Sequence, residues 1–233
     1  MRSTRTLAGV ALAGTIALGA AACGSSSTGS SSSSSPSSSA AAPSSSSSSA
    51  SASASPTPAA EIASLKGVDT AVQVDAKTLA ALTSLKVTVT PTGKAKATTT
   101  YKPATFDFPI TGGNVKVFAK GQVDPYVQGI IHHDGSGLMF AAGGKTLTVE
   151  NFDINPGTSM LMASVKGTSG AKIPLFFLDG SNLQITKDAA GHAKLDGTKV
   201  ELTAESAAAL NKTFSVTAFQ PRMLIGIAHI TAG

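Results

Sequence analysis

The chain has 233 residues, of which a long early part is too polar to pack into a domain. Between Gly24 and Pro58, 21 of the 35 residues are serine, and no side chain is large and apolar, so nothing offsets the entropy of ordering the segment. The part from 59 to 233 is long enough for one domain with its own core. It carries 16 Lys and Arg against 13 Asp and Glu, with no basic run and no Trp, so we expect no nucleic-acid partner.

The first 22 residues predict a secretory signal peptide. Arg2 and Arg5 form a short positive region, and the small, apolar stretch 7–22 follows it. This stretch is too short for a stable membrane span and has the composition of a signal sequence. Cys23, the only cysteine of the chain, comes directly after it. A disulfide within one chain is therefore excluded.

The sequence LGAAAC, which ends at Cys23, resembles the lipobox of bacterial lipoproteins, of the kind found in high-GC Gram-positive bacteria. The resemblance implies that the Cys23 sulfur takes a diacylglycerol and that the chain is cut just before it. It also implies a lipid bilayer as partner and a location on the outer face of the cell membrane. Residues 23–58 would then be a disordered Ser/Pro/Ala-rich tether that carries the domain 59–233. The alternative is an ordinary secreted protein with one spare cysteine.

Beyond residue 59, apolar and polar residues mostly alternate, which predicts β-strands. The predicted strands are 85–90, 104–110, 114–119, 127–133, 138–142, 145–154, 159–165, 172–178, 181–186, 194–203, 214–219 and 224–231. Gly143-Gly144 predicts a hairpin turn, and NPGT (155–158) predicts another turn. Many short strands between such turns predict an all-β fold, a sandwich or barrel of antiparallel strands, with two short capped helices.

The two helices are predicted by their capping residues and by their similarity to each other. Asp75 and Thr203 each precede an alanine-rich helical segment and are expected to be N-caps. The segments 72–82 and 200–210 share five of eleven residues, and each reads as a strand followed by a capped helix and a further strand. We interpret this as a degenerate internal repeat. A chance match of alanine-rich helices is the alternative.

The stretch HHDGSG (132–137) contains reactive residue types but predicts no site. Neighbouring residues of a strand point to opposite faces, so His132 and His133 cannot bind one metal ion together, although His132 and Asp134 could share a face. DGSG is a favourable turn sequence, and Ser136 lacks the strand-to-helix context of a nucleophilic serine. We therefore expect no metal, no catalytic residues and no enzymatic activity.

Four segments in order, GIIHHDGSGLMF, TLTVENFDI, SMLMASVKG and KLDGTKVELTAESAAALN, resemble the HtaA-type domains of bacterial surface haem-uptake proteins. The likeness covers residues 129–211. In that family a tyrosine binds the haem iron and a histidine supports it. The resemblance implies that His133 is the histidine, that Tyr101 or Tyr126 is the iron ligand, and that haem is the cofactor. Shared β architecture alone could produce the same likeness.

The arrangement FPITGGNV (108–115), GSGL and LTVxxFxI (within 135–154) also resembles secreted, lipobox-bearing proteins of high-GC Gram-positive bacteria. Our first hypothesis is a membrane-anchored extracytoplasmic lipoprotein whose β domain is a non-enzymatic binding or envelope module. Its partner would be an unknown small ligand or an envelope component. The alternative is the binding and uptake of haem or of another small apolar ligand.

Overall fold

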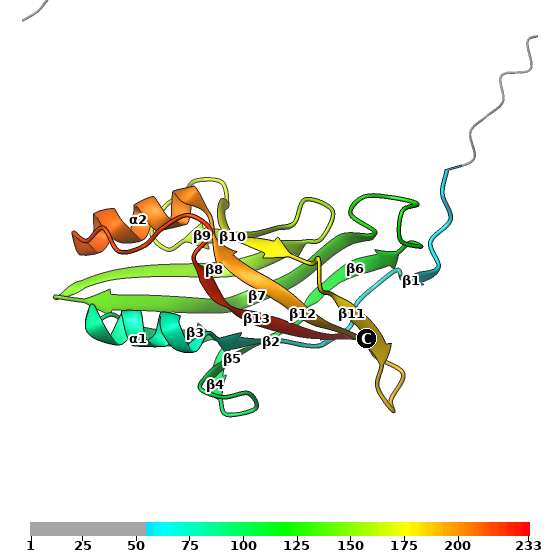
Figure 1. Cartoon of the computed structure of the whole chain (residues 1–233), viewed down its shortest axis with the longest axis horizontal. Helices are drawn as coiled ribbons and strands as arrows, with labels where there is room; N and C mark the ends of the chain where they lie inside the picture. Colours follow the sequence, from blue (N-terminus) through cyan, green and yellow to red (C-terminus); the bar gives the residue numbers. More distant parts are fainter. Residues whose placement is uncertain (1–54) are drawn as a thin grey trace, which may run out of the picture. The chain divides into compact units, whose positions relative to one another are not determined.

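Thirteen β-strands and two helices make up the described part of the chain, residues 55–233, in a computed structural model (Figure 1). The elements are β1 (Ala60–Ile62), β2 (Val68–Val74), α1 (Ala76–Ser84), β3 (Thr88–Gly93), β4 (Lys96–Thr98), β5 (Thr105–Pro109), β6 (Gly112–Val117), β7 (Val127–Ala142), β8 (Lys145–Asn155), β9 (Met160–Val165), β10 (Ile173–Asp179), β11 (Gln184–Lys187), β12 (Ala193–Leu202), α2 (Ala204–Phe214) and β13 (Leu224–Ala232). The predicted signal peptide, Cys23 and the predicted tether up to residue 54 lie outside the described residues.

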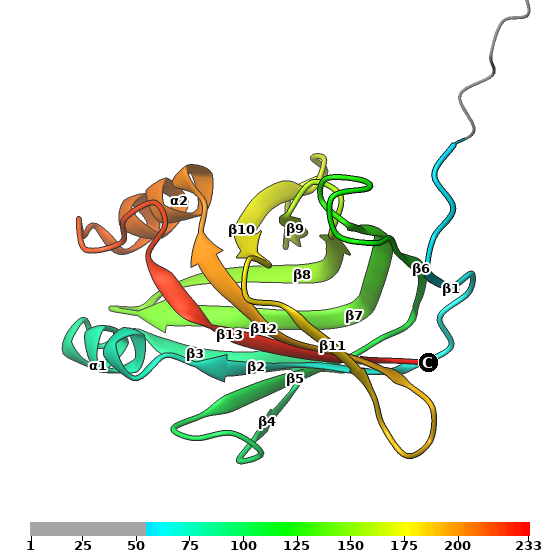
Figure 2. The ribbon, with the colours of Figure 1, turned by 45° about the vertical axis from the view of Figure 1, so that its right-hand side comes forward.

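All the strands belong to one sheet, in the order β1-β6-β7-β8-β9-β10-β12-β13-β2-β5-β4, with β3 paired to β7 and β11 paired to β12. Every strand pair is antiparallel. The sheet curls into a half-barrel, and both helices lie at the end where the β7–β8 hairpin closes (Figures 1 and 2). The predicted all-β class with two short capped helices is confirmed. Among the described residues, neither helix has the length and apolar character that a membrane crossing requires.

Both helices begin at the predicted N-caps. The Asp75 carboxylate accepts hydrogen bonds from the backbone amides of Lys77 and Thr78, and the Thr203 hydroxyl accepts one from the Ser206 amide. Thr203 also donates to the Pro174 carbonyl at 2.7 Å, which ties the start of α2 to β10. A cap is a local interaction over three residues, so the sequence predicts it well.

Both predicted segments are a strand followed by a capped helix, and the predicted further strand follows only the first of them. β2 and β12 pair with opposite edges of β13, and each leads directly into a helix. The strand predicted at 85–90 begins only at Thr88, because Leu85 is the C-cap of α1. The strand predicted at 214–219 does not form, since Phe214 ends α2 and the following residues lie outside any strand.

The turn predicted at DGSG is also wrong. The strands predicted at 127–133 and 138–142 are one 16-residue strand, β7, which runs through this sequence. Its pairing with β8 shifts register between His133 and Gly137, so the polar residues form a β-bulge. The hairpin turn at Gly143-Gly144 and the turn at 155–158 are confirmed.

Candidate ligand-binding site

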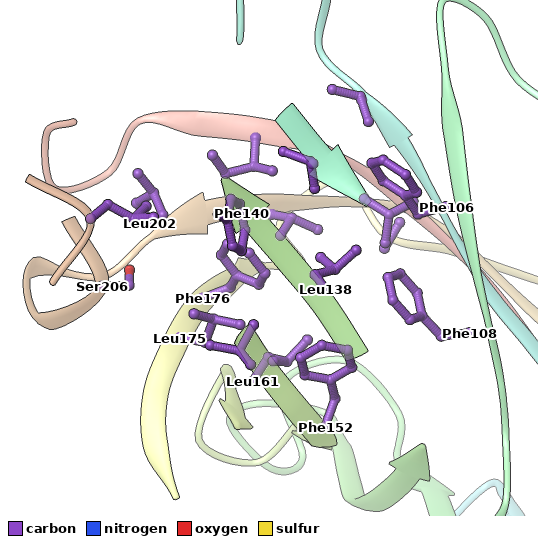
Figure 3. Close-up of a pocket in the computed structure, with 18 of the residues that line it drawn as sticks. Phe106, Phe108, Leu138, Phe140, Phe152, Leu161, Leu175, Phe176, Leu202 and Ser206 are labelled. Carbon is purple, nitrogen blue, oxygen red and sulfur yellow. The ribbon is translucent and has the colours of Figure 1, made fainter. Parts of the chain in front are cut away.

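The concave face of the sheet encloses an apolar cavity of about 100 Å³. Its wall is made by side chains of β2, β3, β5, β7, β8, β9, β10, β12 and β13 together with residues of both helices. Six of the nine phenylalanines of the chain line it: Phe106, Phe108, Phe140, Phe152, Phe176 and Phe219. Figure 3 shows the first five of these side chains, from four different strands, around the same space.

The wall is almost free of exposed polar atoms, although four polar residues belong to it: Thr70, Thr78, His133 and Ser206. The hydroxyl of Thr78 donates to the Leu224 carbonyl, and that of Ser206 donates to the Thr203 carbonyl at 3.2 Å. Both hydroxyls are therefore used by the fold. The polar groups of the wall thus hold the helices in place, and they leave an apolar surface for a ligand.

Part of the wall is half-buried apolar surface. Val89 of β3, Leu147 of β8, Val165 of β9 and Leu82 of α1 all line the cavity and are half-buried. Protein interiors contain few voids larger than a water molecule. An apolar void beside partly exposed apolar side chains is therefore typical of a ligand site with a hydrophobic entrance.

His133 is the one titratable residue of the wall, and its side chain is 1% exposed. Its Nε2 atom shares a hydrogen bond of 2.9 Å with the Thr70 hydroxyl. Its Nδ1 atom is buried and makes no hydrogen bond of normal geometry, although the Phe152 backbone lies close enough to the ring to raise its pKa slightly. The Phe108 ring meets the imidazole edge-on, with 6.4 Å between ring centroids. Burial lowers the pKa of His133 to about 4, so the ring is neutral at physiological pH.

His132 points to the opposite face, as strand alternation predicts. Its Nδ1 atom lies 2.7 Å from a carboxylate oxygen of Asp153, and Lys172 binds the other oxygen at 2.6 Å. Burial raises the pKa of Asp153, but the hydrogen bonds from Lys172 and His132 outweigh it and the pKa falls below its usual value. The two adjacent histidines therefore belong to different environments, one apolar and one charged.

Tyr101 does not reach the cavity. Its ring stacks on His229 with 3.9 Å between centroids and a 10° angle between planes. The Nδ1 atom of His229 lies 3.0 Å from a carboxylate oxygen of Asp196. Ala228, the neighbour of His229 in β13, lines the cavity. Neighbouring residues of a strand point to opposite faces, so His229 and the Tyr101 ring stacked on it lie on the outer face of the sheet.

Tyr126 lines a second cavity, of about 280 Å³, which contains no residue of either helix. Its hydroxyl donates a long hydrogen bond of 3.5 Å to the Leu183 carbonyl, and the ammonium of Lys120 lies 5.4 Å from its ring centroid. The three predicted ligand residues, Tyr101, Tyr126 and His133, therefore occupy three different places. The hydroxyl that meets His133 belongs to Thr70, and no tyrosine lines the first cavity among the described residues.

The remaining residues of HHDGSG contribute to structure. Asp134 is exposed, and its backbone amide donates a hydrogen bond of 2.9 Å to the Thr111 hydroxyl. Ser136 is fully buried in the bulge and does not line either cavity. No cluster of three His, Cys, Asp or Glu side chains suited to a metal ion occurs within residues 55–233.

No protein-family model matches the chain, and no curated protein matches it. Two solved structures from Corynebacterium glutamicum are similar. The C-terminal domain of HtaA has 16% identity and a TM-score of 0.48, and the match covers 72% of this chain and 97% of that domain. The haem-binding protein HtaB has 9% identity and a TM-score of 0.32, with 74% and 95% covered. The first of these structures has the name of the domain type that the sequence resembles. Both TM-scores are below 0.5, so neither structure supports a conclusion about a ligand of this chain.

Proposed function

We propose that the β domain binds a small apolar ligand inside its curled sheet, without catalysis. The observation that carries the proposal is the first cavity, an apolar void whose wall comes from nine strands and both helices. Removal of apolar surface from water supplies the free energy of binding, about 25 cal/mol for each Å². The ligand would be taken up at the half-buried apolar residues of the wall.

The volume of about 100 Å³ limits the size of ligand that fits the cavity as it stands. An engineered apolar cavity of about 150 Å³ in another protein binds benzene. The cavity of this protein is smaller, so benzene is at the upper limit of what binds without rearrangement, and it is the probe. A larger ligand would have to displace side chains of the wall.

The test uses cavity filling on α2. Ala209 lines the cavity, whereas Ala208 is exposed on the same helix. Benzene at about 100 times its dissociation constant should stabilise the wild-type protein by about 2.7 kcal/mol, measured as a rise in the melting temperature. Ala209→Leu should abolish most of this rise, and Ala208→Leu should keep it. No rise in the wild-type protein, or an equal rise in both variants, would contradict apolar-ligand binding.

Haem is the second candidate, because His133 places an unpartnered ring nitrogen on the wall of an apolar cavity. His133 would be the residue that holds the iron. A cofactor pocket typically measures about 300 to 1,000 Å³, so haem requires the wall to open. Hemin titration should then produce a Soret band that His133→Ala removes. An unchanged hemin spectrum excludes haem and leaves the apolar-ligand proposal standing.

We further propose that a diacylglycerol on Cys23 anchors the domain to the outer face of the cell membrane, with the serine-rich segment as tether. The support is the lipobox-like LGAAAC sequence and the composition of residues 24–58. Cys23→Ala should move the protein from the membrane fraction to the soluble fraction, and Ser27→Ala is the control on the same segment. Retention of the Cys23→Ala protein in membranes would contradict the lipid anchor.

A further inference from the structure

The second cavity continues the apolar interior of the sheet beyond the first. Ile154 of β8 and Leu178 of β10 line both cavities, and both are buried. The two spaces are thus separated by a wall of these side chains. The interior of the second cavity is apolar as well, with Ile131, Leu195 and Ile230 on its wall.

The second cavity has more polar lining than the first. Tyr126, Asp124, Asp179 and Ser181 line it, and of these Asp124 and Ser181 are exposed and so lie at its rim. The interior of the domain therefore changes from apolar beside the helices to polar at the rim of the second cavity. A gradient of this kind is typical of a site for an amphipathic molecule.

We propose that the two cavities form one elongated site for a single-chain aliphatic amphiphile with an uncharged, hydroxyl-bearing head. The tail would occupy the first cavity, and the head would lie at the rim of the second. The inference rests on the proposed apolar-ligand function, and it adds the ligand class. Passage of the chain requires a rotamer change at Leu178 or Ile154, whose side chains form the shared wall.

The charges at the rim select the head group. Asp179 accepts a hydrogen bond from the Ser181 amide at 2.9 Å and from the Lys199 ammonium at 3.3 Å. The hydrogen bond from the Ser181 amide is the main cause that holds the pKa of Asp179 below its usual value, and the bond from Lys199 adds to it. The carboxylate is therefore ionised. Asp124 adds a second carboxylate to the wall. The ammonium groups of Lys199 and Lys120 lie behind this wall, on Asp179 and on the Tyr126 ring, and they offset part of the negative charge. An anionic head would still face the two carboxylates directly, whereas a hydroxyl can donate to these oxygens.

The experiment is a chain-length series of n-alkanols from hexanol to dodecanol, with binding measured by calorimetry on the full chain. If a tail extends through apolar space, each added methylene should tighten binding by about fourfold until the space is filled. At equal length, the alkanoate should bind at least about tenfold more weakly than the alkanol. Affinity that is independent of chain length, or tighter for alkanoates, overturns the proposal.

Two leucine variants locate the tail. Leu178→Ala removes part of the shared wall, and Leu183→Ala removes the same atoms from a residue that lines only the second cavity. Leu178→Ala should move the plateau of the series to longer alkanols. Leu183→Ala should weaken all long alkanols alike and leave the plateau at the same length. An unmoved plateau in Leu178→Ala overturns the proposal.

Ile154→Val is a conservative second variant on the same wall, and it serves as the test if Leu178→Ala does not fold. It should move the plateau in the same direction. Failure of the elongated site can be distinguished from failure of the proposed apolar-ligand function. If benzene binds but the alkanol series shows no length dependence, the apolar site stands and the elongated site fails. If neither binds, both fail.

Discussion

At the scale of single residues, the environment of His133 differs most from what its sequence neighbours suggest. The residue lies in a stretch of polar letters, yet its side chain is buried beside Phe108 and bonded to Thr70, which is 63 residues away. Its neighbour His132 lies in a charged cluster on the other face. Alternation along the strand predicts the separation of the two histidines, but it says nothing about the partner of either one.

The buried His133 predicts a specific loss of stability in acid. The unfolded state binds a proton below about pH 6.5, whereas the folded state binds it only near pH 4. Because the unfolded state binds more protons in this window, the free energy of unfolding falls as the pH falls, by about 3 kcal/mol from this residue alone. Chemical denaturation at several pH values between 7 and 4 measures the slope.

The variant His133→Asn should lose this part of the slope, and His192→Asn should keep it. His192 pairs with Asp188 in a turn and does not line the first cavity. Its hydrogen bond lowers the pKa of Asp188, so the slopes are compared above about pH 5, where this carboxyl is ionised in every variant. Asp69, whose pKa is raised by burial and by Asp107, contributes a slope of the opposite sign in all three proteins. Equal slopes in the wild-type protein and His133→Asn would show that His133 is not buried as described.

At the scale of elements, β7 shows how pairing overrides a turn signal. The DGSG sequence has two glycines and an aspartate, yet neighbouring strands satisfy its backbone. The Lys94 amide donates to the Gly135 carbonyl at 2.8 Å, and the Gly135 amide donates to the Asn151 side chain at 2.8 Å. The strand therefore continues as a bulge. Its two halves serve different neighbours, β6 along the first and β3 along the second.

The close approach of β3 to this bulge predicts the effect of Gly93→Ala. Gly93 has φ +63°, and a Cβ there would lie 1.9 Å from the Gly135 carbonyl oxygen. Backbone strain and this overlap together should lower the free energy of unfolding by about 2 to 4 kcal/mol. Gly143→Ala is the control, because Gly143 has φ +57° and no atom within 4 Å of the added Cβ. It should lose only about 1 to 2 kcal/mol, as measured by denaturant unfolding, and equal losses would argue against the contact.

At the scale of the whole molecule, the sheet is open, and its stability should differ from strand to strand. β7 and β8 pair with each other and with further strands on their outer sides. β4 has three residues and ends the strand order, and all four residues of β11 are exposed and pair only with β12. Native-state openings with low free energy are expected where few contacts hold a strand.

Amide hydrogen exchange tests this distribution. Paired amides of β4 and β11 should exchange at least about a hundredfold faster than those of β8, because their opening exposes little apolar surface. A bound apolar ligand should slow exchange in β7, β8 and α2, whose side chains line the first cavity, and leave β11 unchanged. Uniform protection across all strands would contradict this ranking.

The features that the sequence by itself determined are those set by a few neighbouring residues. Asp75 and Thr203 cap the helices, Gly143-Gly144 closes a hairpin, and alternation separates His132 from His133. Each depends on backbone preferences or hydrogen bonds over two to four positions, which the residue types themselves specify. The all-β class follows from the same local patterns.

The candidate site was decided by tertiary structure alone. No local pattern pairs Thr70 with His133, stacks Tyr101 on His229, or leaves Tyr126 in a separate cavity. These contacts depend on which distant strands become neighbours and on how far the sheet curls. The cavity is a property of the space between side chains from nine strands and two helices, so it exists only once the whole sheet has formed.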